Sequence, residues 1–158
     1  MDFNELFNNY WPKVFRLCKG YLGDEALAKD VAQETFITVW QQLHRLRHPK
    51  AVSTWLYRIT VNNCLKYLKL QQKSRDYQEP IPANYVDEEA HDEEPWRLLQ
   101  QGLTQLPEWD RMVLGLYLEE VPQKEIAEIT GLSPGNIRVR LHRIKKKLSQ
   151  KIKENGTE

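Results

Sequence analysis

The fold of this chain is decided by residues 123–147, which read QKEIAEITGLSPGNIRVRLHRIKKK. This stretch predicts two helices joined by a tight turn, because Gly131 can adopt the positive φ that ends a helix. Ser133 then provides an N-cap, and Pro134 occupies the first helical position, where its missing N–H costs nothing. The pattern is typical of a helix-turn-helix, whose second helix enters the DNA major groove.

The second of these helices has an apolar stripe and a polar face. Its apolar residues recur at helical spacing and are Ile137, Leu141, Ile144 and Leu148. Residues 138–153 contain eight Lys or Arg and no Asp or Glu. A basic, solvated hairpin used only for packing is the alternative, but so one-sided a charge favours DNA binding.

The net charge of +1 conceals an uneven distribution along the 158 residues. Residues 43–75 hold eight basic and no acidic side chains, whereas residues 76–95 hold eight acidic and no basic ones. Residues 96–158 are basic again, with eleven cations and eight acids. We therefore expect two basic surfaces separated by an acidic connector.

The chain is expected to be all-α, because no segment shows sustained period-two alternation. Residues 1–75 are expected to form a bundle of about three or four helices, and residues 96–158 a domain of about four helices. Residues 76–95 contain three prolines and eight acids. Such a composition cannot bury enough apolar surface to offset its ordering entropy, so we expect a flexible linker.

Capping residues and prolines set the expected bounds of the other helices. Asp24 and Ser53 are expected to be N-caps, and Pro12 is expected to divide the first helix or to start its longer part. The helices outside the helix-turn-helix are expected at 3–22, 24–43, 53–75, 96–106 and 108–118.

A mostly polar stripe lies opposite the predicted core stripe of the second helix. We call it the 30–41 face, and its members are Asp30, Gln33, Glu34, Ile37 and Gln41. An isoleucine within an acidic and polar face indicates a protein contact. Solvated surface with one stray apolar residue explains the pattern equally well, so both interpretations remain open.

The third helix has one side that is polar along its whole length. We call it the 58–73 face, and its members are Arg58, Asn62, Lys66, Lys69 and Lys73. Four cations with one amide among them predict a track for phosphates and a group that reads a base. Trp55, Tyr57 and Tyr67 lie between them, either as stacking surfaces for unpaired bases or as core residues.

Several other classes of site are not expected. Cys18 and Cys64 are interpreted as buried thiols rather than a disulfide framework. His44 and His48 have no Cys, Asp or Glu nearby to complete a metal site, so we expect neither a metal nor a cofactor. The chain has no nucleophile–base pair, so we expect no enzyme and no small-molecule substrate. The absence of a signal-peptide pattern or a membrane-spanning apolar run predicts a cytoplasmic protein.

Three motifs carry a family resemblance. Residues 30–36, DVAQETF, resemble the core-polymerase-binding helix of the extracytoplasmic-function (ECF) sigma factors, a group within the bacterial sigma-70 family. Residues 54–62, TWLYRITVN, are similar to the promoter-melting signature of that group. Residues 106–119, with the helix-turn-helix that follows, resemble its C-terminal domain.

The resemblance implies two helical domains that bridge RNA polymerase and a promoter. The 30–41 face would dock on the clamp coiled coil of the polymerase β′ subunit. The polymerase β flap would be a second partner of the chain. Asn62 would contact the −10 element, where a flipped base is captured, and residues 44–53 would form part of the pocket. An anti-sigma factor is a further expected partner.

The resemblance also implies a −35 interface on the second helix of the helix-turn-helix. Base contacts would come from Arg138, Val139, His142 and Arg143. The residues nearer phosphate would be Asn136, Arg140, Lys146 and Lys147. We call these eight residues the 136–147 face.

The −10 motif departs from the family in three places. Val61 stands where the family often has Arg, while Lys66 and Lys69 stand where Asp and Arg are common. These departures affect the expected −10 sequence preference more than the DNA contact itself. The alternative function is a stand-alone helix-turn-helix regulator, dimeric and independent of polymerase.

Overall fold

The computed structural model describes residues 2–48, 51–75 and 105–156, with side chains described up to residues 71 and 153 in the last two ranges. Every regular element within them is helical, which confirms the predicted all-α class. The elements in chain order are α1 (Phe3–Leu22), α2 (Glu25–Gln42), η1 (Leu43–Arg45), α3 (Val52–Arg75), α5 (Glu108–Leu118), α6 (Gln123–Thr130) and α7 (Pro134–Gly156).

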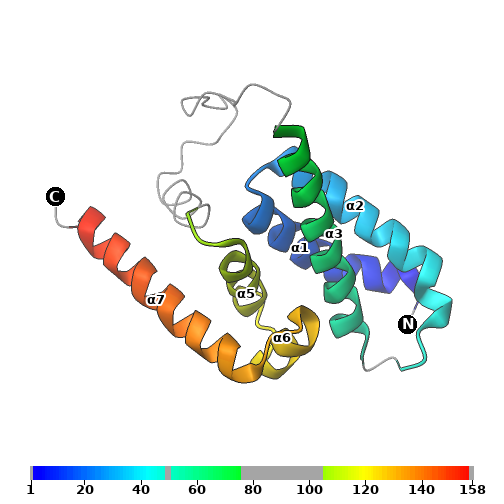
Figure 1. Ribbon diagram of the computed structural model, residues 1–158. Helices are drawn as coiled ribbons and strands as arrows, with labels where there is room; N and C mark the ends of the chain where they lie inside the picture. Colours follow the sequence, from blue (N-terminus) through cyan, green and yellow to red (C-terminus); the bar gives the residue numbers. More distant parts are fainter. Residues whose placement is uncertain (1, 49–50, 76–104, 157–158) are drawn as a thin grey trace.

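The helices form two groups, which we call the N-terminal half (α1, α2 and α3) and the C-terminal half (α5, α6 and α7) (Figure 1). In this view α1, α2 and α3 lie together, α5 and α6 lie beside them, and the far end of α7 extends away from the rest. The predicted linker at 76–95 lies outside the described residues, as does nearly all of the helix predicted at 96–106.

The first helix is unbroken at Pro12, so the expected division there is wrong. Pro12 and Asn8 are both exposed, so water can bond the carbonyl group that proline leaves without a donor. Aromatic contacts continue past this position. The ring of Trp11 stacks on those of Phe7 and Phe15, with centroid distances of 5.2 and 6.2 Å. Packing on both sides of the proline thus holds the helix together.

Of the two predicted N-caps at the starts of α2 and α3, one is confirmed and one is wrong. Asp24 caps α2, because its Oδ1 accepts a hydrogen bond from the N–H of Leu27 at 3.1 Å. Ser53 does not cap α3, because the helix already begins at Val52. Val52 is buried, so apolar packing places the start of this helix one residue earlier than the capping pattern suggested.

The core of the N-terminal group contains both cysteines. Cys18 of α1 and Cys64 of α3 are buried free thiols whose sulfur atoms lie 3.8 Å apart, which confirms the sequence interpretation. The contact with Cys64 and burial both raise the pKa of the Cys18 thiol well above its ordinary value. These residues therefore behave as small apolar core side chains.

The two groups of helices share one hydrophobic cluster, because α1 packs on α5 and α3 packs on α6. Gly115 of α5 lies so close to α1 that a Cβ atom there would be 2.7 Å from Cδ1 of Leu17. The guanidinium of Arg111 lies 5.2 Å from the ring centroid of Tyr21. Burial raises the pKa of Tyr21 to about 12. The sequence predicted two apolar cores but not their junction.

Candidate nucleic-acid and polymerase interfaces

The helix-turn-helix forms as predicted. Gly131 ends α6 with a φ of 79°, and its N–H donates to the carbonyl of Ala127. Ser133 Oγ accepts a hydrogen bond from the N–H of Asn136 at 3.1 Å, as expected of an N-cap. The predicted apolar stripe of α7 packs inward, with Ile137 fully buried.

Most of the 136–147 face is open to solvent because the apolar stripe of α7 is covered. Arg138 and Val139 are exposed, and 64% of Val139 is accessible. The remaining exposed members are Asn136, His142, Arg143, Lys146 and Lys147. Arg140 differs from them in being half-buried. The position of these side chains is compatible with the predicted DNA contacts, which remain a prediction.

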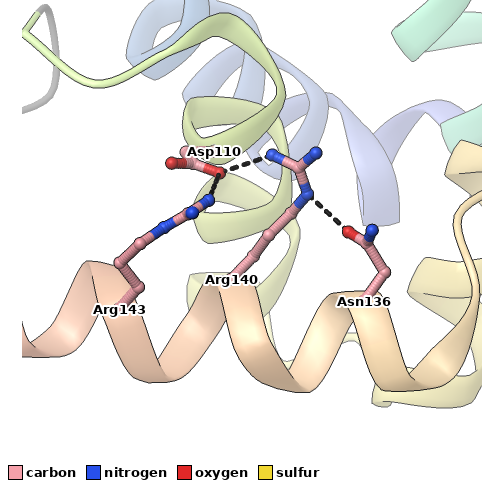
Figure 2. Close-up of polar contacts among 4 residues, drawn as sticks. All are labelled: Asp110, Asn136, Arg140 and Arg143. Atoms are coloured by element: carbon pink, nitrogen blue, oxygen red, sulfur yellow. Dashed lines mark hydrogen bonds and ion pairs between the residues drawn. The ribbon is translucent and has the colours of Figure 1, made fainter.

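Arg140 is held by groups of its own domain (Figure 2). Its Nη1 donates to Oδ1 of Asp110 at 2.8 Å, and its Nε donates to Oδ1 of Asn136 at 2.6 Å. Nη2 of Arg143 lies 3.6 Å from the same Asp110 oxygen. Arg140 was expected to contact phosphate, but two of its donors, Nε and Nη1, already make hydrogen bonds within the protein.

Sequence reasoning missed Asp110, although a signal was present. Asp110 lies in the first turn of α5 at helical spacing from Leu106, Val113 and Leu114, all of which are buried. An acid on the buried side of a helix requires a partner of opposite charge, because burying a lone carboxylate is costly. The partner could then have been sought on the basic helix α7.

The 58–73 face of α3 is largely exposed. Asn62, Lys66 and Lys69 are open to solvent, whereas the side chain of Lys73 lies outside the described residues. Arg58 is also exposed, but its Nη2 donates to the backbone carbonyl of Glu128 in α6 at 3.0 Å. One of the predicted phosphate contacts is thus occupied by the other half of the chain.

Asn62, the amide of the 58–73 face, is exposed, whereas its neighbour Asn63 is half-buried. Asn63 donates from Nδ2 to Oγ1 of Thr35 at 3.1 Å. Asn63 therefore links α3 to α2. Only Asn62 is presented to a ligand.

The three aromatic residues of α3 pack into the core, as the second of the two interpretations proposed. Trp55 and Tyr67 are half-buried against the shared cluster. Tyr57 is 3% exposed and makes an edge-to-face contact with Tyr10 at a centroid distance of 6.2 Å. Burial raises the pKa of its hydroxyl well above the ordinary range. Tyr57 therefore presents no stacking surface, whereas Trp55 and Tyr67 remain partly accessible.

The 30–41 face is exposed at all five of its members. Ile37 has 57% of its surface accessible, and Trp40, one turn further along α2, has 66%. Sequence reasoning missed Trp40, whose spacing of three residues from Ile37 was the available signal. Two neighbouring exposed apolar side chains strengthen the interpretation of this side as a protein contact.

Two family models match the chain. Sigma-70 region 2 matches residues 6–74, and Sigma-70 region 4 matches residues 96–148. The helical fold, with a basic helix in each half, thus defines a protein of the sigma-70 class.

Relatives narrow this class. The ECF RNA polymerase sigma factor SigM of Bacillus subtilis is 30% identical, covering 94% of this chain and 93% of its own length. The ECF RNA polymerase sigma-E factor of Haemophilus influenzae is 31% identical, covering 95% and 87%. The chain belongs to the ECF family of RNA polymerase sigma factors.

Solved structures share the fold. The sigma factor RpoE of Bartonella quintana, in complex with the anti-sigma factor NepR, has a TM-score of 0.78 at 19% identity, covering 96% of this chain and 97% of that one. CnrH, in complex with the cytosolic domain of CnrY, has a TM-score of 0.67 at 20% identity, covering 96% and 88%.

The family defines the function. This protein is an alternative sigma factor of bacterial RNA polymerase, which binds the core enzyme and directs promoter recognition at transcription initiation. Sigma factors are initiation factors rather than enzymes. Among the described helices, none combines the length and the apolar character needed to cross a membrane.

Proposed function

We propose that the three faces divide the work of the sigma factor among them. The 58–73 face contacts the −10 element, the 136–147 face contacts the −35 element, and the 30–41 face docks on the β′ clamp coiled coil. The β flap is a second contact in this proposal. The protein acts in the cytoplasm, without catalysis, cofactor or small-molecule substrate of its own.

The observation that carries this proposal is a pair of exposed basic helix faces, one in each half of the chain. α3 presents Lys66 and Lys69, and α7 presents Arg138 and Lys146, while both helices bury their apolar sides. Such faces bind phosphate through Lys and Arg and read bases through the polar groups among them. Exposed Asn62 and Arg138 supply those polar groups.

The proposal divides the chain into domains at 1–75 and 96–158, joined by a linker at 76–95. Each domain binds its own promoter element, and the linker makes the second contact effectively intramolecular. Arg58 already donates from Nη2 to the carbonyl of Glu128, so a promoter phosphate that needs this donor competes with the contact between α3 and α6.

Melting follows from a difference in affinity. A domain that binds an unstacked base better than a paired one shifts the duplex toward the open form by that difference. Asn62 is the group assigned to this base, with residues 44–53 forming part of its pocket.

An inhibitory partner is part of the proposal, because the sigma factor RpoE of Bartonella quintana was solved in complex with the anti-sigma factor NepR. An anti-sigma factor that binds this chain would hold it away from polymerase. The partner itself is to be identified by co-purification from the native host.

The test is reconstitution. The full chain is mixed with core RNA polymerase, the complex is isolated by gel filtration, and transcripts are sequenced from a randomised promoter library. We expect a stable complex and a two-part consensus. A consensus that lacks one of the two elements would remove the corresponding basic face from the proposal.

A further inference from the structure

The carboxylate of Asp110 in α5 contacts two arginine side chains of α7. Asp110 is 1% exposed and belongs to α5, whereas Arg140 and Arg143 belong to α7. Both guanidinium groups approach the same atom, Oδ1, at 2.8 and 3.6 Å (Figure 2). The other oxygen, Oδ2, is buried without a hydrogen-bond partner among the described residues. Among the described residues, the negative charge of Asp110 is therefore compensated by the two arginines of α7.

The two arginines are held to different degrees. The side chain of Arg140 is 23% exposed and is fixed at Nε by Asn136 as well as at Nη1 by Asp110. The side chain of Arg143 is 52% exposed, and its distance from Asp110 permits an ion pair without a hydrogen bond. Asp110 thus immobilises one guanidinium and draws the other toward α5.

Electrostatics makes this arrangement relevant to DNA. A cation that is already paired with a carboxylate releases fewer counterions from DNA than a free one, so it adds less to sequence-independent affinity. A guanidinium whose orientation is fixed loses less entropy when it meets a specific acceptor. Restraining Arg140, which is assigned to phosphate, therefore lowers the general attraction of α7 to DNA. Restraining Arg143, which is assigned to a base, lowers the entropy lost when that base contact forms.

We propose that Asp110 is a positioning residue for −35 recognition, which restrains Arg140 and Arg143 so that promoter sequence, rather than phosphate charge, dominates binding by α7. This inference rests on the proposed function of the 136–147 face. A carboxylate that only links α5 to α7 has different consequences. Its loss would weaken binding to every sequence alike, whereas loss of a positioning residue strengthens binding to the wrong sequences.

The experiment compares Asp110→Asn with the unmodified chain, each as holoenzyme with core RNA polymerase. One probe is a duplex that wild-type holoenzyme selects from a library randomised at −35, and the other is the same duplex with that element scrambled. Affinities are measured between about 50 and 200 mM salt, the range in which phosphate contacts are resolved. Thermal unfolding of each chain provides the folding control.

We expect Asp110→Asn to bind the scrambled duplex about threefold to tenfold more tightly at the lowest salt, with a log–log salt slope steeper by about 1 because Arg140 is freed for phosphate. The preference for the selected duplex should fall at least about fivefold. Adding Arg140→Gln to this variant should reverse the change in slope, and Asp110→Glu should restore the preference. Weaker binding to both duplexes with an unchanged slope would overturn the proposal.

A second comparison keeps the proposal testable if Asp110→Asn does not fold. Arg140 and Lys146 of α7 are both assigned to phosphate, and of these two Arg140 is the one paired with Asp110. Arg140→Gln should reduce the salt slope by less than half as much as Lys146→Gln, and equal reductions would overturn the proposal. Arg138→Ala separates this failure from a wider one: if it leaves the preference for the selected duplex unchanged, the −35 assignment itself is wrong.

Discussion

The basic helices α3 and α7 differ in the groups that accept hydrogen bonds from their arginine side chains. On α3, Arg58 donates to a backbone carbonyl of α6, which belongs to the other half of the chain. On α7, Arg140 donates to the carboxylate of Asp110 within its own half. The first partner is lost when the halves separate, whereas the second remains. The contact of Arg58 on the 58–73 face thus depends on how the halves are arranged, and the contact of Arg140 on the 136–147 face does not.

The partners also differ in strength. A hydrogen bond between an exposed guanidinium and a neutral carbonyl is easily exchanged for one with water. A buried ion pair with a second bond to Asn136 is harder to replace, because breaking it leaves an uncompensated charge. The contact of Arg58 is thus releasable, whereas that of Arg140 is fixed.

The largest effect is expected where Gly115 of α5 packs against Leu17 of α1. Gly115→Leu places a side chain where even a Cβ would lie 2.7 Å from Leu17, and such overpacking costs about 1–3 kcal/mol. We expect the midpoint of urea unfolding to fall and small-angle scattering to show a larger radius of gyration. Gly20→Leu is the control, because a Cβ at Gly20 meets no atom within 4 Å. An unchanged radius with Gly115→Leu would mean that this contact does not hold the halves together.

A second variant tests base reading on α7. Arg138 is exposed and unrestrained by Asp110, so Arg138→Ala should reduce discrimination at −35 by about 1–3 kcal/mol. Lys147→Ala, on the same helix, should weaken selected and scrambled duplexes equally. Competition binding of holoenzyme to the two duplexes measures both effects. If Arg138→Ala behaved like Lys147→Ala, base reading would have to be assigned to other residues.

A third variant tests base capture on α3. Asn62→Ala removes the exposed amide and should reduce open-complex formation by about 1–2 kcal/mol more than it reduces duplex binding. Lys66→Ala should reduce the two to the same extent, because a phosphate contact exists in both states. Permanganate footprinting reports opening and filter binding reports the closed complex. Equal losses for Asn62→Ala would exclude the flipped-base role.

The smallest effect is expected at an ion pair between the halves. Arg16 donates through Nε and Nη2 to both carboxylate oxygens of Glu119 at 2.7 and 2.9 Å, and its own side chain is 58% exposed. Arg16→Gln should cost about 0.2–1 kcal/mol of stability, with the difference shrinking at high salt. Lys29→Gln is the charge-matched control on α2. A loss that persists at 1 M salt would indicate packing rather than charge.

Periodicity and capping predicted much of the fold and most of the exposed faces. The bounds of α1 and α5 agree with the expected ranges, and the apolar stripe of α7 is buried as expected. These features are local, because they depend on residues within one or two helical turns. The site assignments that rest on the family resemblance remain predictions.

The contacts that could not be predicted from the sequence join residues far apart in the chain. Periodicity shows that Leu17 lies on an apolar side but not that Gly115 covers it. It also placed Arg140 by its helical position, although a long side chain can carry its charge toward a partner such as Asp110. Pro12 favoured a break that aromatic packing overrides.

The contact between Arg58 and Glu128 makes two equilibria reciprocal. In the proposed complex, a promoter phosphate and the carbonyl of Glu128 would compete for the Nη2 donor of Arg58, so occupation by either would disfavour the other. By thermodynamic linkage, the factor by which separated halves bind the −10 element more tightly equals the factor by which that DNA promotes their separation. Under the proposed −10 assignment, promoter DNA would be an opening ligand of the free protein, and a partner that stabilises the closed form would weaken DNA binding by the linked factor.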